Sequence, residues 1–410
     1  MSMKGFGLLG RKLGHSFSPR IHAFLGDYAY PLYEKEPEEL ESFLRSGIFG
    51  ALNVTVPYKE TVIPYLDELT LRAEKIGAVN LILNKNGRLV GDNTDYYGFV
   101  QMISRVGADV QGKKVLILGS GGASKMVRAV LSDLGAGEII TVSRKGPENY
   151  ETAVRHTDTF MIVNATPVGM YPNNYASPIS LAPFSECRYV LDLIYNPQKT
   201  RLMLDAEARG IKTQNGLWML IAQAKEGSSL FTGKAIDEGE VSRIYEILSH
   251  ESRNLVLVGM PGSGKSTVSS ILSRKTGRDV HCLDQIISLS AGMPIPEIFA
   301  QFGEAYFREL ESFTLCEYAK HPGMILDCGG GIVTRKENFE ALRQNGFVVF
   351  LNRGWDKLPT DGRPLSDGAD LEKMYENRLP LYRAVCDLEL DTTDLSPEET
   401  AETILEAFLK

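Results

Sequence analysis

A glycine-rich segment in the second half of the chain constrains its fold more than any other feature. Residues 259–267 read Gly-Met-Pro-Gly-Ser-Gly-Lys-Ser-Thr, directly after the apolar run at 255–258 and before a helix-like segment. A buried strand that feeds such a loop into a helix turns several backbone N–H groups and the helix N-terminus toward one point. There Lys265 can neutralise phosphate oxygens and Ser266 can hold Mg²⁺. The alternative is a glycine-rich turn with Lys and Ser after it by chance, and the strand and helix around the loop argue against it. The residues predicted to form this phosphate site are Gly259, Gly262, Ser263, Gly264, Lys265, Ser266 and Thr267.

The position of this loop divides the chain, because only about 155 residues follow its strand, which is roughly one domain. With 410 residues, 43% of them hydrophobic, the chain has the length for two or three domains. The net charge of -8 predicts no attraction to nucleic acid or to acidic membranes, and no run approaches the roughly 18 apolar residues of a membrane span. The five cysteines have no C-x-x-C spacing, which favours a reducing cytoplasm over a disulfide framework or a zinc site. The first ten residues lack the pattern of an export signal.

A second glycine loop lies in the first half of the chain, after the apolar run at 115–118. It leads into an apolar helix predicted from about 125 to 134 and then into a strand predicted at 138–142. This order is typical of a Rossmann dinucleotide-binding domain, whose glycines permit a tight turn and a close approach of pyrophosphate to the helix N-terminus. The residues predicted to bind the cofactor here are Gly119, Ser120, Gly121, Gly122, Ala123 and Ser124.

The end of the next strand indicates which dinucleotide binds. An NAD site carries Asp or Glu there for the ribose hydroxyl, whereas this chain has Ser143, Arg144 and Lys145. Two cations favour the 2′-phosphate of NADP. The alternative is that both are solvated cations on a surface loop.

Two serines lie in the loop that follows a strand predicted at 5–10. In an extended loop, Ser16 and Ser18 point the same way and could meet one polar ligand. Ser18 could equally cap a helix that begins near Arg20 with Pro19 at its first position. Both readings stay open at this point.

The alternating run at 50–59 predicts a further strand, with Leu52, Val54 and Val56 on its apolar face. A hairpin is predicted at 86–87, and more polar residues stand near the ends of its strands. Each polar residue, taken singly, is more often a turn former than a ligand. The polar residues in question are Asn53, Thr55, Lys59, Asn80 and Asp95.

The order and spacing of these motifs resemble the shikimate dehydrogenase family. The motifs are His15-Ser16-x-Ser18-Pro19, Asn53-Val54-Thr55-x-Pro57-x-Lys59, Gly77-Ala78-Val79-Asn80 and Asn93-Thr94-Asp95-x-x-Gly98. The similarity extends over about 5–248, with later motifs at 163–170 and 192–200. It implies that Lys59 and Asp95 form a proton-transfer pair. The residues that it implies around the cyclohexene acid are Ser16, Ser18, Asn53, Thr55, Lys59, Asn80, Asp95, Tyr195 and Gln223. Without the resemblance, Gln223 reads as a helix-surface residue.

The remainder of the chain, about 254–410, resembles shikimate kinase. Its motifs are Gly303-Glu304-x-x-Phe307-Arg308-x-x-Glu311, Gly329-Gly330-Gly331, Gly362-Arg363-Pro364-Leu365 and Arg378-x-Pro380-x-Tyr382. The forked donors of arginine suit a carboxylate, and an arginine in a proline-flanked loop suits a closing lid that contacts ATP. Solvation at the surface is the alternative for each arginine. The implied shikimate ligands are Asp284, Arg308, Gly330, Gly331 and Arg378, and the catalytic residues are Lys265 and Arg363.

One residue departs from the kinase pattern, since Cys282 stands where the family has a second aspartate that helps with Mg²⁺. Asp327, at the end of a strand predicted at 324–326, is a conceivable substitute that would act with Ser266.

The sequence therefore predicts an α/β protein with a substrate lobe (1–100 plus 217–250), a Rossmann NADP-binding domain (101–216) and a P-loop kinase domain (254–410). The expected function is reduction of 3-dehydroshikimate with NADPH, followed by phosphorylation of shikimate with ATP and Mg²⁺. The alternatives are a dehydrogenase that prefers quinate, a different small-molecule kinase, or a kinase-like module without turnover. The expected partners are these small molecules, with neither nucleic acid nor membrane, in the cytoplasm.

Overall fold

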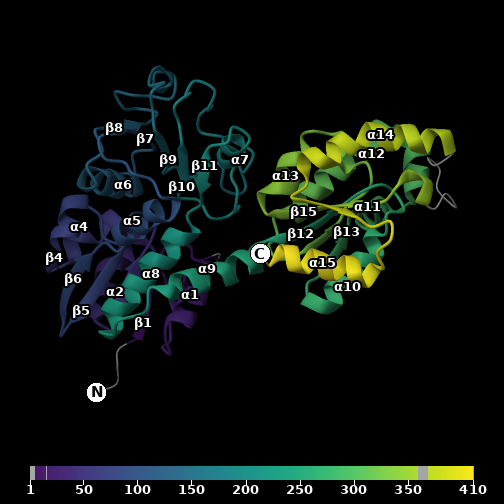
Figure 1. The fold of residues 1–410 in the computed structure, drawn as a ribbon. Helices are drawn as coiled ribbons and strands as arrows, with labels where there is room; N and C mark the ends of the chain where they lie inside the picture. The colour runs from purple at the N-terminus through teal and green to yellow at the C-terminus, as the bar shows by residue number, and fades with distance from the viewer. Residues whose placement is uncertain (1–4, 15, 359–367, 410) are drawn as a thin grey trace. The chain divides into compact units, whose positions relative to one another are not determined.

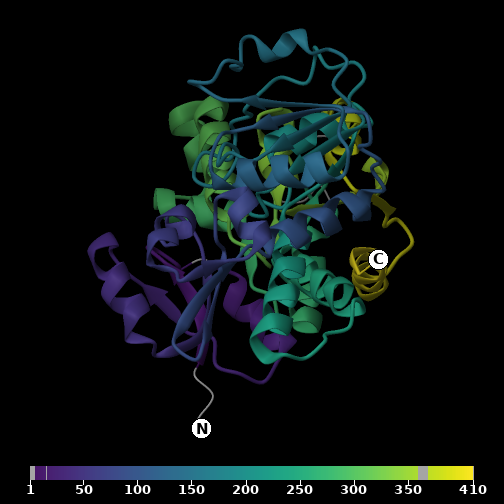
Figure 2. The same cartoon turned by 90° about the vertical axis from the view of Figure 1, so that its left-hand side faces the viewer.

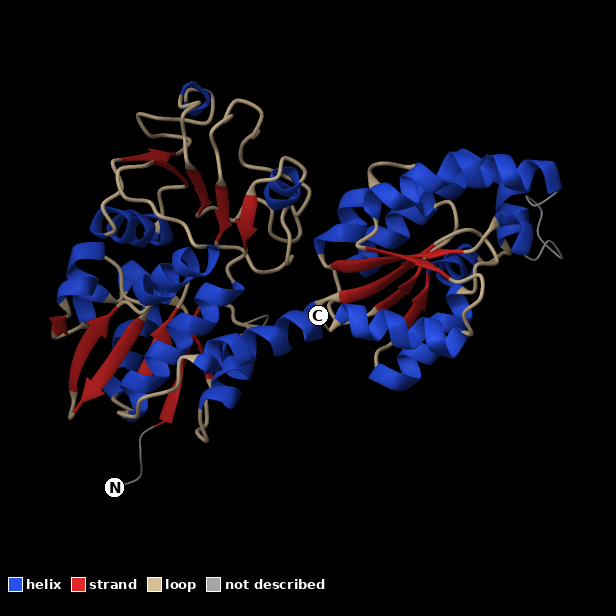
Figure 3. Ribbon diagram, viewed as in Figure 1, coloured by secondary structure: helices blue, strands red, loops and turns tan. Residues whose placement is uncertain are grey.

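Short apolar runs separated by glycine turns fold into β-strands flanked by helices, as the sequence predicts for an α/β protein (Figures 1 and 3). The computed structural model describes residues 5–14, 16–358 and 368–409. The chain splits into two compact units, Met1–Asn196 with Thr200–Ile247, and Pro197–Lys199 with Leu248–Lys410. Among the described residues, the first unit contains two sheets and the second contains one.

The first sheet of the first unit is mixed and has the strand order β2-β1-β3-β5-β6-β4. The predicted hairpin is present, because Asn86 and Gly87 both have positive φ (57° and 92°) and join two antiparallel strands. The strands are β1 (Gly5–Gly10), β2 (Leu32–Glu34), β3 (Phe49–Val54), β4 (Glu68–Leu69), β5 (Leu81–Lys85) and β6 (Arg88–Asp92). The helices of this lobe are α1 (Ser18–Leu25), α2 (Leu40–Ser46), α3 (Tyr58–Thr61) and α4 (Leu71–Ile76).

One prediction for this lobe is wrong, because the strand predicted at 50–59 ends at Val54. The chain turns there, since the amide of Tyr58 donates to the carbonyl of Thr55 at 2.9 Å. Val56 is therefore 72% exposed rather than part of an apolar face. Lys59 lies on helix α3, and β3 is a central strand whose polar Asn53 is buried as well.

The second sheet is parallel throughout and has the strand order β11-β10-β9-β7-β8. Ligands of such open sheets bind where the strand order reverses, at the carboxyl ends of the strands. Helix α6 begins at Gly122, three residues before the predicted start, because the glycine loop closes directly onto it. The strands are β7 (Lys114–Leu118), β8 (Glu138–Val142), β9 (Met161–Asn164), β10 (Tyr189–Asp192) and β11 (Lys212–Gln214), and the helices are α5 (Asp95–Val106), α6 (Gly122–Asp133) and α7 (Arg201–Glu207).

Helix α8 (Leu217–Thr232) returns the chain to the mixed sheet, where it packs against α1, α5 and β3. Figures 1 and 2 show this teal helix beside the purple N-terminal segments. Helix α9 (Gly239–Ser252) follows, and the division between the two units falls inside it.

The second unit has one parallel sheet with the order β13-β14-β12-β15-β16. Helices α10 and α15 pack on one of its faces and α12, α13 and α14 on the other, each over an apolar cluster. The strands are β12 (Asn254–Val258), β13 (Val280–Cys282), β14 (Ile325–Asp327), β15 (Gly346–Asn352) and β16 (Leu388–Asp391). The helices are α10 (Lys265–Thr276), α11 (Leu283–Ala291), α12 (Ile295–Ala319, with a kink at Gly303), α13 (Asn338–Gln344), α14 (Gly368–Val385) and α15 (Pro397–Phe408).

No helix in the described part of the chain is long and apolar enough to cross a membrane.

Candidate functional sites

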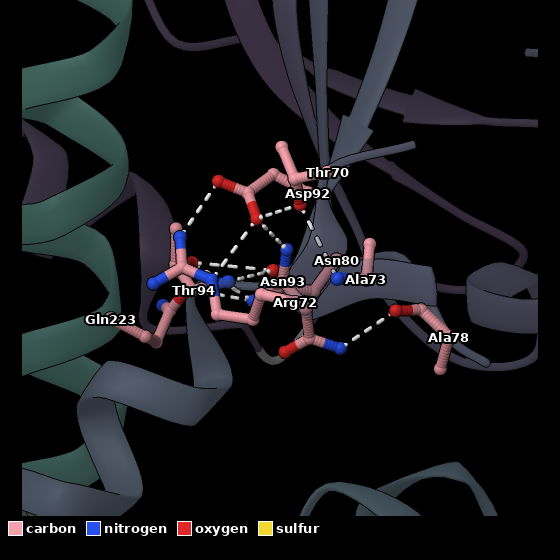
Figure 4. A network of polar contacts seen from close by, with 9 residues as sticks. All are labelled: Thr70, Arg72, Ala73, Ala78, Asn80, Asp92, Asn93, Thr94 and Gln223. Atoms are coloured by element: carbon pink, nitrogen blue, oxygen red, sulfur yellow. Dashed lines mark hydrogen bonds and ion pairs between the residues drawn. The ribbon is translucent and has the colours of Figure 1, made fainter. Parts of the chain in front are cut away.

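Three polar residues from different segments meet beside the ends of strands β5 and β6 in the mixed sheet (Figure 4). Asn80 precedes β5, Thr94 precedes α5, and Gln223 projects from α8. The Asn80 amide nitrogen donates to Thr94 Oγ1 at 3.0 Å and to Gln223 Oε1 at 3.3 Å. The Thr94 amide donates to Asn80 Oδ1 at 2.6 Å, and its hydroxyl donates to Gln223 Oε1 at 3.2 Å. This network fixes two of the predicted substrate ligands, Asn80 and Gln223, against each other.

Lys59 and Asp95 form an ion pair in the same lobe. Lys59 Nζ lies 2.6 Å from Asp95 Oδ2, and the two side chains are 24% and 12% exposed. Asp95 is the first residue of helix α5, where the helix dipole favours a carboxylate. The pair is thus ordered, yet still open to a ligand.

Asp92 anchors the short loop of Asn93 and Thr94 that leads into helix α5 (Figure 4). Asp92 accepts from Arg72 Nε at 3.0 Å, from Arg72 Nη2 at 2.7 Å and from the Thr70 hydroxyl at 2.6 Å. Burial alone would raise the pKa of Asp92, but the hydrogen bonds from Arg72 and Thr70 hold this pKa below its ordinary value. Asp92 is therefore charged at neutral pH, and the loop position is rigidly defined.

The Ser16–Ser18 loop lies beside Tyr195, because the rings of Phe17 and Tyr195 are 5.3 Å apart. The prediction that Ser18 caps the helix is wrong, since Phe17 is the N-cap of α1 and the described part of the chain provides no side-chain cap there. Instead Ser16 Oγ accepts from the Ser18 amide at 3.2 Å. Burial raises the pKa of Tyr195. The structure thus brings these three predicted ligands near one another.

Thr55 follows the end of β3, next to the end of β1, where its amide donates to the Leu9 carbonyl at 2.9 Å. Asn53, on β3, is 5% exposed, and its Oδ1 accepts from the Tyr30 hydroxyl at 2.6 Å.

The glycine loop of the parallel sheet leaves room for a ligand at the start of α6. Gly119 has φ +107°, and a Cβ there would lie 3.0 Å from Thr166 Cγ2, so glycine is required. A Cβ at Gly121 would meet nothing within 4 Å, so the space before the helix N-terminus is open. Ser120 belongs to the same turn, and Ala123 and the buried Ser124 lie in the first turn of α6. This cradle of backbone amides fits a pyrophosphate.

The cations predicted to select NADP stand just beyond β8. Arg144 and Lys145 are both exposed, and the amide of Ser143 donates to the Glu148 carbonyl at 3.0 Å. This turn places the three residues at the strand end, where a dinucleotide ribose binds in such sheets.

A cavity of about 440 Å³ in the second unit contains most of the residues predicted there. Its size lies in the usual range for small-molecule sites. The predicted residues that line it are Gly262, Lys265, Ser266, Asp284, Arg308, Asp327, Gly330, Gly331 and Arg378. Gly259, Ser263, Gly264 and Thr267 belong to the same loop and to the first turn of α10.

The phosphate end of this cavity carries a cation and a carboxylate. Lys265 Nζ donates to the carbonyls of Gly259 and Met260, each at 3.0 Å. Ser266 Oγ donates to Asp327 Oδ2 at 2.6 Å, which joins the helix N-terminus to the end of β14. Ser263 Oγ is buried and has no hydrogen-bond partner among the residues that the structure describes. The loop is thus equipped for phosphate oxygens.

Cys282 stands opposite Asp327, because the two are register partners on β13 and β14. Burial raises the pKa of the Cys282 thiol, with smaller contributions from Asp327 and Asp284. No cluster of three or more His, Cys, Asp and Glu side chains in the described residues is arranged to hold a metal ion. The oxygens of Ser266 and Asp327 nevertheless match the hard ligands that Mg²⁺ prefers, with phosphate and water completing its shell.

The other end of the cavity presents Arg308 and Asp284. The Arg308 guanidinium is engaged by Glu304 Oε1 at 3.0 Å and by Glu311 Oε2 at 2.8 Å. A Cβ at Gly331 would lie 1.9 Å from Arg308 Nη1, so only glycine leaves room for the guanidinium. Burial raises the pKa of Asp284.

Arg378 and Tyr382 fix the glycine triplet from α14. Arg378 Nη1 donates to the Gly330 carbonyl at 3.1 Å, and the Tyr382 hydroxyl donates to the same oxygen at 2.5 Å.

Comparison with known proteins identifies both parts of the chain. A family model described as shikimate dehydrogenase substrate binding domain matches residues 8–82, and the shikimate kinase model matches residues 261–409. The chain is 37% identical over 268 residues to shikimate dehydrogenase (NADP(+)) of Clostridium perfringens strain SM101, covering 60% of this chain and 98% of the relative. The chain belongs to the shikimate dehydrogenase family and continues into a shikimate kinase domain. Both resemblances predicted from the motifs are confirmed, and the chain is a bifunctional shikimate-pathway enzyme.

Solved structures agree for the dehydrogenase part. Shikimate dehydrogenase 1 from Peptoclostridium difficile is 38% identical, with a TM-score of 0.56, over 60% of this chain and 98% of that chain. The enzyme from Thermus thermophilus in complex with shikimate is 31% identical, with a TM-score of 0.53, over 60% of this chain and 99% of that chain.

Several residues at the two shikimate-family sites were not singled out from the sequence. Thr94 joins Asn80 to Gln223, although within the sequence it reads as part of a turn. In the kinase domain, Ile295 and Phe299 line the cavity, and their spacing of one helical turn was the available signal. The predicted lid residue Arg363 lies outside the described residues.

Proposed function

We propose that the dehydrogenase part reduces 3-dehydroshikimate to shikimate with NADPH, and that the kinase domain transfers the γ-phosphate of ATP to the shikimate 3-hydroxyl with Mg²⁺. The observation that supports it best is the Lys59–Asp95 ion pair at 2.6 Å beside the Asn80–Thr94–Gln223 network. We assign residues 1–100 with 217–250 to the substrate lobe, 101–216 to the NADP domain and 254–410 to the kinase.

In the reduction, Lys59 acts on the carbonyl oxygen of the substrate. A nicotinamide cofactor, when held by the glycine loop of the parallel sheet, would supply the hydride for the carbonyl carbon. Lys59 Nζ donates a proton to the oxygen as negative charge develops there, and Asp95 holds the ammonium in place at 2.6 Å. Acid–base help of this kind contributes about 10²–10⁴-fold to the rate.

Around the ring, the Ser16 and Ser18 hydroxyls, Asn53, Thr55 and Tyr195 would bind the carboxylate and hydroxyls, together with the amides of the polar network. Gly119 to Ser124 would hold the pyrophosphate of the cofactor, with Arg144 and Lys145 on its 2′-phosphate.

In the phosphoryl transfer, the side chains of this domain would position the two substrates and neutralise the charge of the phosphate groups. Lys265 would leave the Gly259 and Met260 carbonyls for the phosphate oxygens, and Ser266 with Asp327 would hold Mg²⁺. Mg²⁺ supplies charge neutralisation when bound. Asp284 would orient the attacking hydroxyl, with Arg308, Arg378 and the glycine triplet around the ring. Arg363, which lies outside the described residues, is assigned to the ATP phosphates by the family resemblance alone.

The two reactions follow each other chemically, because the product of the first is the substrate of the second. We propose a cytoplasmic location, which the five cysteines without disulfide pairing support.

A coupled assay with 3-dehydroshikimate, NADPH and MgATP tests this function. The parent chain should oxidise NADPH and then release ADP. Lys59→Ala should lose the first step yet still release ADP when shikimate is supplied, whereas Lys265→Ala should show the reverse. The proposal is contradicted if either variant loses both activities or keeps both. Activity on quinate with NAD that exceeds the activity on shikimate with NADP would also contradict it.

A further inference from the structure

The side chain of Asn53 has only one orientation that satisfies its neighbours. Its Nδ2 lies 3.4 Å from the Asn80 carbonyl oxygen, and its Oδ1 lies 2.6 Å from the Tyr30 hydroxyl. A flipped amide would set Oδ1 against the Asn80 carbonyl, which can only accept a hydrogen bond. The oxygen of the amide therefore accepts from Tyr30, and the nitrogen has a long contact with the Asn80 carbonyl. The Asn53 side chain also interacts with His22, the residue on which the Tyr30 ring stacks.

Tyr30 can hold this orientation because its own ring is fixed. Its ring stacks on His22 with centroids 3.9 Å apart and planes 15° apart. His22 Nδ1 lies 2.7 Å from the Tyr28 hydroxyl, which donates to Ser228 on α8 at 2.8 Å. The stack thus ties Tyr30 to helices α1 and α8.

Both rings also keep a constant protonation state. Burial lowers the pKa of His22 to about 3, so its ring is neutral near pH 7. Burial raises the pKa of Tyr30 well above its ordinary value, so its hydroxyl remains a donor. Tyr30 therefore presents one O–H donor to Asn53 at neutral pH.

We propose that Tyr30 is a positioning residue that fixes the Asn53 amide, so that Nδ2 faces the substrate as a hydrogen-bond donor. This rests on the proposed function, in which Asn53 binds the ring of the substrate. Asn53 then recognises an oxygen acceptor, a hydroxyl or a ketone oxygen, rather than a donor. Tyr30 itself makes no contact with the substrate.

The variant Tyr30→Phe keeps the ring stack and removes only the donor. Asn53 then loses the hydrogen bond from Tyr30, while His22 stays beside its side chain. The KM for shikimate in NADP⁺-dependent oxidation should rise about 5- to 10-fold, the range expected for one hydrogen bond. The KM for NADP⁺ and the turnover number should stay within about twofold. Tyr33→Phe is the matched control, because Tyr33 lies on β2 and packs its ring on Phe43 instead. An unchanged KM for shikimate in Tyr30→Phe overturns the proposal.

A double-mutant cycle separates this inference from the proposed function. Asn53→Ala should raise the KM for shikimate, and adding Tyr30→Phe to it should have no further effect. If the two effects multiply, Tyr30 does not act through Asn53, and the inference fails while Asn53 remains a ligand. If Asn53→Ala alone leaves the KM unchanged, the assignment of Asn53 as a substrate ligand fails instead.

Discussion

Removal of the Arg72 guanidinium should destabilise the dehydrogenase unit strongly, because it leaves a charged carboxylate without its main partner. The Asp92 side chain is 8% exposed and that of Arg72 is 26% exposed. Breaking a buried pair costs about 3–5 kcal/mol, whereas an exposed pair contributes about 0–1 kcal/mol. Thr70 and the Asn93 amide still donate to Asp92 after the change. We expect Arg72→Ala to lower the free energy of unfolding by about 3 kcal/mol.

The measurement is urea unfolding followed by the fluorescence of Trp218, which lies in the dehydrogenase unit. The chain has two tryptophans, so Trp355→Phe removes the signal of the other unit. The matched control is Arg88→Ala, whose ion pair with Glu68 is 63% and 52% exposed. It should change the free energy of unfolding by less than about 1 kcal/mol.

The effect should also depend on pH, because Arg72 holds the pKa of Asp92 below its ordinary value of 3.8. A depressed pKa in the folded state stabilises the protein above the unfolded pKa and loses this contribution as the pH falls through the folded pKa. The difference in the free energy of unfolding between the parent and Arg72→Ala should thus be largest near pH 7 and should shrink below about pH 4. The reasoning is refuted if the parent and Arg72→Ala have equal free energies of unfolding at pH 7. It is also refuted if their difference does not become smaller as the pH is lowered.

Three further predictions concern the chemistry. Lys59→Ala should lower the rate of reduction by about 10²-fold or more, because Lys59 acts on charge that develops in the transition state, with shikimate affinity within several-fold. Near-normal turnover would exclude this role. Arg144→Ala should raise the KM for NADPH by about 10-fold and leave that for NADH nearly unchanged, since only NADPH has the 2′-phosphate. Equal changes would remove Arg144 from the site. Asp327→Asn should raise the Mg²⁺ concentration for half-maximal kinase activity several-fold, and Cys282→Asp should partly reverse this, because Mg²⁺ prefers oxygen ligands. Reduction serves as the internal control, and an unchanged Mg²⁺ dependence would show that Asp327 does not help to hold the metal.

The two glycine loops could be predicted from the sequence because their requirements are local. A strand, a turn that needs positive φ, and a helix that starts at once are all encoded within about 20 residues. Gly119 has φ +107° and Gly264 has φ +93°, and each loop lies at the carboxyl end of a buried strand. The order of the motifs also identified both families.

The contacts between distant segments were decided only by the tertiary structure. Asn80 and Gln223 are 143 positions apart, and Ser266 and Asp327 are 61 apart. Hydrogen bonds of this kind leave no periodic pattern, since either partner alone reads as a turn or surface residue.

Local patterning also failed where the chain turned. Alternation placed Val56 on an apolar face, but the backbone turn after Val54 exposes it, because β3 ends there. Arg308 stays a predicted carboxylate ligand, and the fold places Glu304 and Glu311 beside its guanidinium. The sequence by itself determined the fold class, the two families and the phosphate loops, since these follow from local backbone geometry and apolar patterning. The Lys59–Asp95 pair was implied by the family resemblance. Hydrogen bonds such as that between Asn80 and Gln223 were decided by the packing of segments that are remote in the chain, and so they are a property of the tertiary structure.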